Sequence, residues 1–229
     1  MIEKEVPILE GKDIHRSFQT GGGRLDVLKG VCLEVFPGEM VGVVGASGVG
    51  KSTLLHILGA LDRPDKGKVN LNSKDVFSLN DRQLASFRNK TIGFVFQFHH
   101  LLPEFSALEN VMMPSLIAGE NEEKIRDKTK RILEELGLLD RSDHRPGELS
   151  GGEQQRVAVA RALINDPLVV IADEPSGNLD KKNKEELHEL LTELNRRKNQ
   201  TFIIATHNEE LAQKAARVYR LKDGIAQLV

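Results

Sequence analysis

The stretch from Met40 to Thr53, MVGVVGASGVGKST, constrains what this chain can fold into more than any other. Its apolar, β-branched opening, Met40 to Val44, suits a strand that is buried on both faces. Gly45 to Ser52 then fits the pattern G-x-x-x-x-G-K-[ST], and residues 54–61 have helical apolar spacing. A strand, a glycine-rich loop and a helix in this order predict a phosphate-binding loop. The alternative is a glycine-rich turn that fits the pattern by accident, and such a turn would have no reason to lie between a strand and a helix.

The chemistry of such a loop follows from its residue types. Gly45, Gly48 and Gly50 let the backbone bend until several N–H groups point at one anion, and the helix N-terminus adds its dipole. Lys51 is expected to reach the β- and γ-phosphates of a nucleotide. The Ser52 hydroxyl is a ligand for Mg²⁺ in the same pattern.

Composition excludes several other classes. The chain has 229 residues, enough for one large domain with an inserted lobe, and its net charge of -2 gives no support to nucleic-acid binding. Cys32 is the single cysteine, so an internal disulfide is impossible. The N-terminus lacks the layout of a signal peptide, and no apolar run approaches the roughly 18 residues that span a bilayer. We therefore expect a soluble, cytosolic protein.

Four buried strands are expected, and each one ends at a polar residue or at the phosphate loop. The strands are residues 40–44, 92–96, 168–172 and 201–205, and they end at Gly45, Gln97, Asp173-Glu174 and His207. In an open parallel sheet, ligands bind beyond the carboxyl ends of the strands. These strand ends and the loop therefore converge on one nucleotide.

The remaining segments frame this core. Residues 8–14 and 31–36 alternate as antiparallel strands of a small N-terminal sheet with a loop at 21–23, and 67–77 is a further strand pair. Helices are expected over 81–89, 153–164 and 181–197, and a final hairpin over 217–229. From about 98 to 156 helical spacing dominates, with Ile125, Ile132, Leu133 and Leu136 on one face and Gly137 as a C-cap. We expect one domain, 1–229, with a core of 1–97 and 157–229 and a helical lobe between.

Asp173 and Glu174 carry the chemistry expected at the second strand end. Asp173 follows a hydrophobic strand, as the Mg²⁺-holding carboxylate of phosphate-loop proteins does. Glu174 is placed to act as the general base for an attacking water. An acidic pair at a strand end is common in loops, and Gln97 or His207 alone would be unremarkable. Together they are candidates for contacting Mg²⁺, water and the γ-phosphate.

A second anion site is predicted at the sequence LSGGEQQR, residues 149–156. Ser150, Gly151 and Gly152 cap a helix whose free N–H groups and dipole attract anions. A nucleotide whose phosphates are held by the phosphate loop does not need a second anion site on the same copy of the chain. The second site becomes useful when two copies face each other, and the alternative is an ordinary helix cap.

These motifs together resemble the nucleotide-binding subunits of ATP-binding-cassette (ABC) transporters, over essentially the whole chain. The resemblance implies an α/β, RecA-like P-loop NTPase core with an N-terminal antiparallel β subdomain and an inserted helical lobe. GASGVGKST is similar to the Walker A loop, LVVIADE to Walker B, residues 176–180 to the D-loop, and Gln97 and His207 to the Q- and H-loops. It implies catalysis by Glu174, His207, Gln97 and Lys51. It implies Mg²⁺ ligands Ser52, Gln97 and Asp173. Implied ATP contacts are Phe18, Gly45, Ala46, Ser47, Gly48, Val49, Gly50, Lys51, Ser52, Thr53, Ser150, Gly151 and Gly152.

Two residues depart from the family pattern. Phe18 stands where the adenine-stacking aromatic is usually Tyr, so a hydroxyl is missing although the stacking face remains. Without the resemblance, Phe18 could equally be a core residue. Glu153 stands where many members have Gln. The resemblance therefore does not imply a nucleotide contact by the Glu153 side chain, but it still implies the contacts of Ser150 and Gly152.

Within the family, residues 94–114 and the SGNLD sequence resemble the branch of lipoprotein-releasing, macrolide-export and cell-division ATPases. The sequence of this segment is most similar to that of the lipoprotein-releasing members. The resemblance implies an ATP-dependent homodimer at the cytoplasmic face of the inner membrane, driving separate permease subunits. Macrolide exporters carry their membrane domain on the same chain, and we expect none here. Alternatives are a cell-division or export ATPase, a soluble ABC protein outside transport, and a nucleotide switch with little turnover.

The apolar segment from Phe98 to Phe105 is a candidate for the contact with the membrane subunit. It directly follows Gln97, at the expected junction of core and lobe. We expect part of it to line a groove for a short helix of the permease. The alternative is that these side chains pack the lobe.

Overall fold

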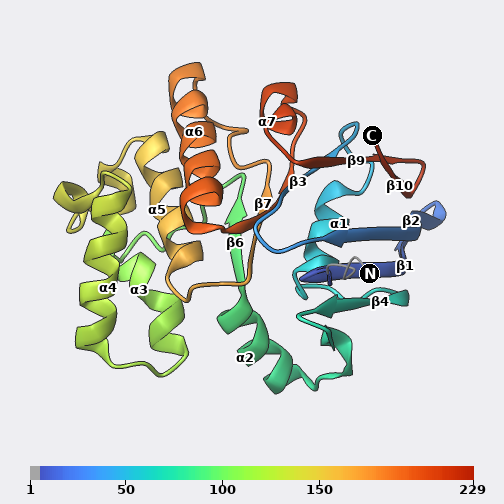
Figure 1. Cartoon of the computed structure of the whole chain (residues 1–229), viewed down its shortest axis with the longest axis horizontal. Coiled ribbons are helices and arrows are strands. Elements are labelled where there is room, and N and C mark those ends of the chain that lie inside the picture. Colours follow the sequence, from blue (N-terminus) through green and yellow to red (C-terminus); the bar gives the residue numbers. More distant parts are fainter. Residues whose placement is uncertain (1–5) are drawn as a thin grey trace, which may run out of the picture.

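The computed structural model describes residues 6–229, which form two β-sheets with helices packed around them (Figure 1). The larger sheet has the order β10-β9-β3-β8-β7-β6, parallel except for β10. Its strands are β3 (Met40–Val44), β6 (Ile92–Phe96), β7 (Val169–Asp173), β8 (Thr201–Ala205), β9 (Arg217–Lys222) and β10 (Ile225–Leu228). The four buried strands expected from the sequence are thus neighbours in one sheet.

The parallel strands are buried on both faces, which explains their continuous apolar runs. Because alternate side chains point to opposite faces, Val41 and Ile203 join the hydrophobic cluster that contains α1 (Lys51–Leu58). Met40 and Phe202 join a second cluster, with α5 (Gly151–Leu163) and α6 (Lys181–Lys198). The sheet therefore separates two cores, and α1 runs from the phosphate loop into the first.

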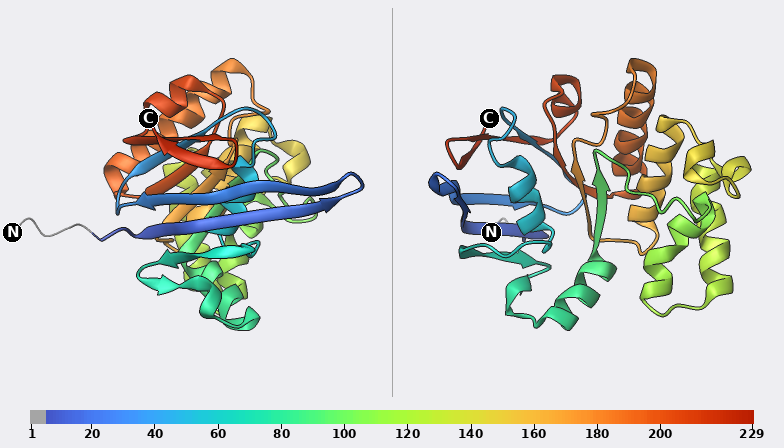
Figure 2. Two further views of the ribbon diagram at one scale, coloured as in Figure 1. Left: turned by 90° about the vertical axis from the view of Figure 1, so that its right-hand side faces the viewer. Right: turned by 180° about the vertical axis from the view of Figure 1, so that it is seen from behind.

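The smaller, antiparallel sheet has the order β2-β1-β4-β5. Its strands are β1 (Leu9–Thr20), β2 (Gly23–Val35), β4 (Lys66–Leu71) and β5 (Lys74–Asp75). The β1–β2 hairpin is longer than the expected strands 8–14 and 31–36, and it projects from the molecule (Figure 2, left). Its tip, residues 18–26, is exposed on both faces. A strand with no buried face has no apolar alternation, so the sequence pattern could not mark it.

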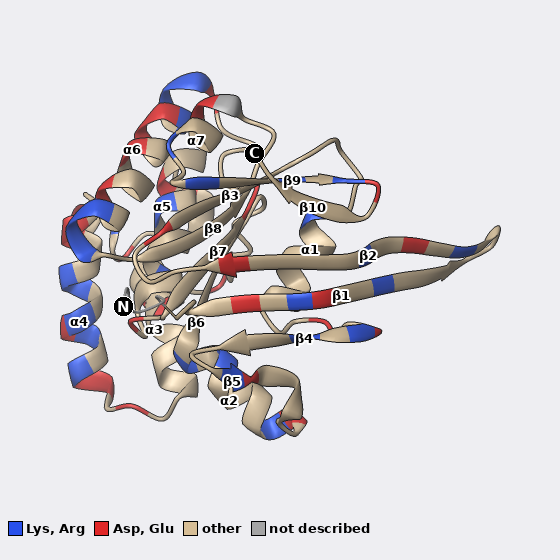
Figure 3. Cartoon of the chain, turned by 45° about the vertical axis from the view of Figure 1, so that its right-hand side comes forward, with Lys and Arg blue, Asp and Glu red and all other residues tan. Residues whose placement is uncertain are grey.

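Between β6 and β7 the chain forms helices and turns, as the sequence predicts. The helices before and within this region are α2 (Asp81–Thr91), α3 (Ala107–Ile117) and α4 (Glu122–Glu135), with short 3-10 turns at Val76–Ser78, Leu139–Arg141 and Pro146–Glu148. Side-chain N-caps begin the α-helices after α1: Asn80, Ser106, Asn121, Ser150, Asp180 and Asn208. Helices α4 and α6 are rich in Lys, Arg, Asp and Glu (Figure 3), and most of these residues are exposed.

Several elements differ from those expected. The helix expected over 54–61 begins at Lys51 and ends at Leu58, because Gly50 in the left-handed conformation starts it and Gly59 follows it. The expected core–lobe boundary at 156 falls inside α5, a continuous helix that contacts both α3 and β6. A short helix, α7 (Glu209–Gln213), was not expected.

The described residues include no helix that is both long and apolar enough to cross a membrane.

Candidate nucleotide site

The phosphate loop joins β3 to α1 in a conformation that needs glycine. Gly50 has a φ of 108° and immediately precedes the first helical residue. A Cβ there would lie 2.6 Å from Cγ1 of Val27 on β2, so a larger residue would be both strained and crowded. The first N–H groups of α1 consequently face the end of β3, which is the arrangement that binds anions.

Lys51 starts α1 and is almost fully buried, with only 8% of its side chain exposed. Its ammonium donates to the carbonyl oxygens of Gly45, at 3.0 Å, and Ala46, at 3.3 Å. Its Nζ also lies 3.6 Å from Oε1 of Glu174. The loop thus holds one cation at its centre, in reach of the carboxylate at the end of β7.

The ends of β3, β6, β7 and β8 meet at one pocket of about 420 Å³. Most of the residues predicted from the strand ends line it, together with the phosphate loop. The lining residues are Val27, Ser47, Gly48, Gly50, Lys51, Ser52, Thr53, Gln97, Glu174 and His207. Gly45, Ala46 and Val49 belong to the loop without lining the pocket, and Asp173 lies one residue before Glu174 at the end of β7.

Glu174 and His207 form a contact between neighbouring strand ends. Nδ1 of His207 lies 2.8 Å from Oε2 of Glu174, and the His207 backbone N–H donates to the same oxygen at 3.3 Å. The Glu174 carboxylate is only 16% exposed, whereas His207 is 70% exposed. Lys51 on one side and His207 on the other therefore fix the direction of this carboxylate.

Gln97 is exposed at the end of β6 and contacts the segment that follows Glu174. Its Nε2 donates to Oδ1 of Asn178 at 3.1 Å, and Nδ2 of Asn178 donates to the Gln97 carbonyl at 3.2 Å. The next residues, His99 and His100, accept hydrogen bonds through their carbonyls from the Arg161 guanidinium on α5, both at 2.7 Å. The loop after Gln97 is thereby tied to both the pocket and α5.

Ser150 caps α5 at a distance from this pocket and does not line it. The Ser150 Oγ accepts from the Glu153 N–H at 3.3 Å, and Glu153 accepts from the Ser150 N–H at 2.8 Å. The bonds from Ser150, with the Arg141 guanidinium 3.0 Å away, lower the pKa of Glu153. Glu153 thus completes the cap, so its departure from the family pattern has a structural role.

Gly152 is the buried member of this cap. A Cβ at Gly152 would lie 2.0 Å from Oδ1 of Asn183, near the start of α6. Ser150 and Gly151, in contrast, are exposed. The beginning of α5 therefore presents these two residues to solvent while packing closely against α6.

Phe18 lies on β1, outside the lining of the pocket, and 39% of it is exposed. It is therefore not a core residue. It pairs with Leu25 on β2, two residues before Val27, which does line the pocket. The ring faces the guanidinium of Arg16, whose central carbon lies 4.9 Å from the ring centroid.

Comparison with known proteins decides the family. The family model described as "ABC transporter" matches residues 28–177, which run from β2 through the phosphate loop and α5 to the segment after Glu174. The chain belongs to the ABC transporter family. The predicted family is thereby confirmed.

Curated relatives of this ABC protein extend the match over nearly its whole length. The lipoprotein-releasing system ATP-binding protein LolD of Geobacter metallireducens is 56% identical, covering 95% of this chain and 96% of the relative. LolD of Cytophaga hutchinsonii is 55% identical, covering 95% and 98%. The narrower resemblance to the lipoprotein-releasing branch is confirmed as well.

Solved structures confirm the α/β P-loop fold class. A dimeric bacterial ABC transporter cassette matches with a TM-score of 0.88 at 38% identity, covering 96% of each chain. A dimeric, post-hydrolysis state of an ATP-binding cassette with bound ADP and Pi matches with a TM-score of 0.87 at 37% identity, again covering 96% of each chain. The two structures share the ABC cassette fold with this protein.

The pocket of this ABC protein fits a magnesium ion on its own chemistry. Oδ1 of Asp173 is buried and, among the described residues, has no hydrogen-bond partner. A buried carboxylate oxygen without a partner is costly unless a cation or a water meets it. Ser52, with a hydroxyl, and Gln97, with an amide oxygen, line the adjacent pocket. Oxygen donors of these kinds are the ligands that Mg²⁺ prefers.

Several neighbours of the site were not predicted from the sequence. Val27 in the pocket wall and the contact between Gln97 and Asn178 follow no motif spacing. The buried hydrogen bond between His188 and Ser176, which fixes the segment after Glu174, also has no such signal. These contacts join residues distant in sequence, so only the fold brings them together.

Proposed function

We propose that this ABC protein hydrolyses ATP to drive membrane subunits that release lipoproteins from the inner membrane towards the outer membrane. The observation that carries this proposal is the single pocket joining the phosphate loop to Gln97, Glu174 and His207. The lipoprotein-releasing relatives, at up to 56% identity over almost the whole chain, support the cargo class. The protein works at the cytoplasmic face of the membrane as a peripheral subunit.

In this proposal the phosphates of ATP lie against residues 45–53, where backbone N–H groups, the α1 dipole and Lys51 attract them. The adenine stacks on the exposed ring of Phe18. Ser52, Gln97 and Asp173 would hold Mg²⁺, which neutralises charge on the phosphates when bound. The unpartnered Asp173 oxygen supports this assignment.

Glu174 is the general base in this proposal. Its carboxylate accepts a proton from the attacking water as the water oxygen bonds to the γ-phosphorus and the bond to ADP breaks. His207, 2.8 Å from Oε2, and Lys51, 3.6 Å from Oε1, hold the carboxylate in position. Gln97 contacts the water and the γ-phosphate from the neighbouring strand end.

A second copy of the chain completes the site. Ser150 and Gly151 are exposed at the start of α5 but outside the pocket of their own copy. We assign Ser150, Gly151 and Gly152 to the γ-phosphate of the nucleotide bound by the partner copy. The dimeric state of the matching cassette structure supports this arrangement.

The membrane subunits dock, in this proposal, in a groove between the core and the helices. The groove has a volume of about 420 Å³, and the residues that line it include Leu61, Phe94, Phe96, Pro114, Ile117 and Arg161. Arg161 also donates hydrogen bonds to the loop after Gln97. This side chain therefore connects the groove to the segment that follows the nucleotide pocket. An apolar groove of this kind accepts a short amphipathic helix.

The groove proposed here is not the one expected from the sequence, in which part of residues 98–105 would form the lining, and that expectation stays a prediction. None of those residues is among the groove lining. Leu101 is 9% exposed and belongs to the core, whereas Phe98 and Leu102 are 62% and 39% exposed. A charge at Leu101 would therefore unfold the lobe and report nothing about docking.

Copurification tests the proposed partner. Ile117, which lines the groove and is 71% exposed, is changed to Glu in a tagged chain co-expressed with its membrane subunits. Leu139→Glu is the matched control, because Leu139 is 38% exposed on the same lobe outside the groove. We expect Ile117→Glu to lose the membrane subunits and keep the ATPase rate of the isolated protein. Equal retention by both variants would place the docking surface elsewhere.

Release itself tests the cargo. Membrane vesicles that carry the complex and a tagged outer-membrane lipoprotein should release the lipoprotein only with ATP and an intact Glu174. Copurification with a cell-division or macrolide-export membrane subunit instead would favour one of the alternative branches.

A further inference from the structure

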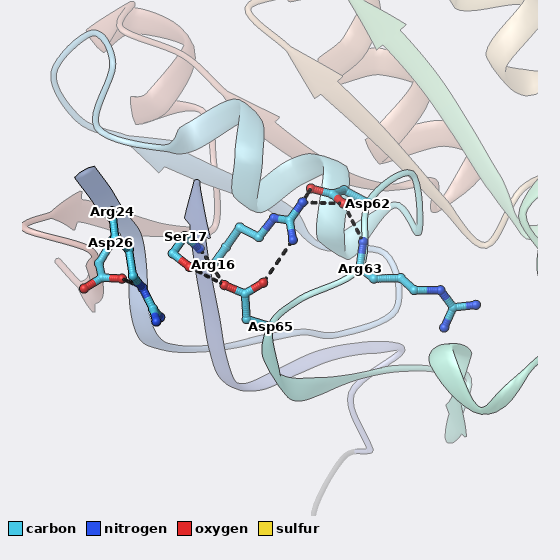
Figure 4. A network of polar contacts seen from close by, with 7 residues as sticks. All are labelled: Arg16, Ser17, Arg24, Asp26, Asp62, Arg63 and Asp65. Carbon is cyan, nitrogen blue, oxygen red and sulfur yellow. Dashed lines mark hydrogen bonds and ion pairs between the residues drawn. The ribbon is translucent and has the colours of Figure 1, made fainter. Parts of the chain in front are cut away.

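Arg16 lies at the centre of a polar network on the first strand of the small sheet (Figure 4). One guanidinium nitrogen contacts Asp62, at 2.8 Å from Oδ2 and 3.0 Å from Oδ1. The other donates to Oδ1 of Asp65 at 3.0 Å. The Arg16 side chain is only 23% exposed. Two carboxylates thus hold the Arg16 guanidinium in a fixed plane. The planar fork of donors on a guanidinium suits this arrangement better than the single ammonium of a lysine would.

Asp65 is itself held by the residue between Arg16 and Phe18. The hydroxyl and the backbone N–H of Ser17 both donate to Oδ2 of Asp65, each at 2.7 Å. The Asp65 backbone N–H donates to the carbonyl of His15 at 2.8 Å. The bonds from Ser17, and then the nearby Arg16 guanidinium, lower the pKa of Asp65, so it stays charged at neutral pH.

The guanidinium that Asp62 and Asp65 fix also contacts the Phe18 ring. Arg16 and Phe18 are two residues apart on β1, and the strand has a register irregularity between Arg16 and Ser17. The central carbon of the guanidinium lies 4.9 Å from the ring centroid, within the range of a cation–π contact. Phe18 is 39% exposed, which leaves room for a second planar group against its ring.

Asp62 and Asp65 connect this contact to the phosphate loop. Both follow α1, and the Asp62 backbone N–H donates to the carbonyl of His56 in α1 at 3.2 Å. Helix α1 begins at Lys51, in the phosphate loop. A chain of contacts therefore runs from the phosphate loop through α1, the two aspartates and Arg16 to the Phe18 ring.

We propose that Arg16 is a positioning residue for the nucleotide base, which sets the Phe18 ring at a fixed place relative to the phosphate loop. The inference rests on the proposed stacking of adenine on Phe18. Arg16 itself does not touch the base. It orders the ring before the nucleotide arrives, and a preordered platform loses less conformational freedom on binding.

Binding of ATP and of inorganic tripolyphosphate, compared by calorimetry, tests the proposal, because tripolyphosphate has no base. We expect Arg16→Gln to weaken ATP binding about three- to ten-fold and to leave tripolyphosphate binding unchanged. Arg24→Gln is the matched control. Arg24 lies on the same hairpin and pairs with Asp26 at 2.8 Å, outside the contacts of Phe18. This control should change neither affinity.

A double-mutant cycle separates Arg16 from Phe18. If Arg16 acts through the ring, Arg16→Gln should have no further effect on ATP binding in a Phe18→Ala chain. Suppose that Phe18→Ala weakens ATP binding. The proposal would then be overturned if Arg16→Gln leaves the ATP affinity unchanged, or if it lowers the affinities for ATP and tripolyphosphate equally. An unchanged affinity in Phe18→Ala would overturn both the positioning role and the stacking itself.

Asp62→Asn covers the case in which Arg16→Gln fails to fold. That variant keeps Arg16 and its contact with Asp65 but loses the charge of one anchor. It should weaken ATP binding in the same direction by a smaller factor, again without an effect on tripolyphosphate. A loss of both affinities in a folded Asp62→Asn chain would assign the network to the structure of the hairpin alone.

Discussion

At the residue scale, Glu174 has a backbone conformation that residues other than glycine rarely adopt. Its φ is 46°, and its N–H donates to the carbonyl of Ala205 on the neighbouring strand at 2.9 Å. Such a left-handed residue costs about 1–3 kcal/mol, and residues of this kind cluster at functional sites. The turn directs the carboxylate between Lys51 and His207.

Replacing Glu174 by Gln tests the general-base role directly. The amide has nearly the same shape but cannot take the proton of the attacking water, so we expect turnover to fall about 10²–10⁴-fold while ATP still binds. ATP that binds and is not hydrolysed should hold two copies together. Light scattering with Mg-ATP should show this dimer, and near-normal turnover or a monomer would contradict the assignment.

A buried histidine stabilises the segment that follows Glu174. Nε2 of His188 on α6 lies 2.9 Å from Oγ of Ser176, and the two side chains are 2% and 4% exposed. Burial chiefly lowers the pKa of His188 from its ordinary 6.5. Lys214 and Lys184 lower it further, and Glu210 and Glu185 oppose them. Folding therefore favours the neutral imidazole.

The sign of the pH effect follows from this shift. Below pH 6.5 the unfolded chain binds a proton at His188 that the folded chain does not, so the free energy of unfolding falls as the pH decreases. Thermal unfolding between pH 7.5 and 5 should show a steeper loss of stability in the wild type than in His188→Phe. The pKa of His99 is lowered as well, but His99 is present in both chains. Parallel curves would contradict the role of His188.

Motif spacing predicted the residues that line the pocket, apart from Val27, but not the residues that hold them in place. Lys51, Ser52, Gln97, Glu174 and His207 lie at strand ends or in the loop, where topology alone brings them together. No comparable rule predicts from the sequence which residues contact these side chains. Gln97 and Asn178 are 81 positions apart, and their contact depends on how two loops fold at the edge of the sheet.

At the element scale, the packing of α5 against β6 depends on one glycine. A Cβ at Gly93 would lie 2.3 Å from the Ala162 carbonyl oxygen, which belongs to the backbone of α5 and cannot move alone. The close approach also sets the groove, since Gly93 and Ala162 both line it.

Replacing Gly93 by Ala should therefore push the helix from the strand. We expect a loss of about 1–3 kcal/mol in the free energy of unfolding, by analogy with overpacked cores. Chemical denaturation would measure it. Gly22→Ala is the control, because a Cβ at Gly22 meets no atom within 4 Å. Equal stabilities of the two variants would show that α5 shifts without cost.

Elements with a buried side were predictable, and exposed or very short ones were not. Strands β3, β6 and β8 have the bounds that their apolar runs predict, because burial on both faces demands such runs. The tip of the β1–β2 hairpin, residues 18–26, has no buried face, and the two strands extend beyond the expected bounds. Helix α7 spans only Glu209–Gln213, too few residues to show an apolar period.

At the scale of the whole molecule, the proposed function assigns two half-sites to each copy. The pocket with Lys51 and Glu174 opens at the carboxyl ends of the strands, while Ser150 caps α5 outside it. The sequence predicted both halves, but a single chain does not contain their contact. The proposed function places the shared site in a dimer, and mixing copies that each lack one half tests this.

Two inactive chains should restore activity to each other if the site is shared. Ser150→Arg keeps its own phosphate loop but blocks the cap that faces a partner. Lys51→Ala loses its own loop chemistry but keeps an intact cap. Neither chain alone forms an ATP-bound dimer, so the dimers in an equal mixture contain both chains, and each has one complete site of two. We therefore expect recovery of up to about half of the wild-type ATPase rate.

The mixture also needs a control for the added arginine. Ser86, exposed on α2, is far in sequence from the cap, and Ser86→Arg alone should keep normal activity. Ser150→Arg alone should bind ATP through Lys51 yet neither dimerise nor hydrolyse it. If the mixture stays as inactive as its components while each chain remains folded, Ser150 does not act on a partner's nucleotide. A Ser150→Arg chain that hydrolyses ATP by itself would lead to the same conclusion, because one copy would then hold a complete site.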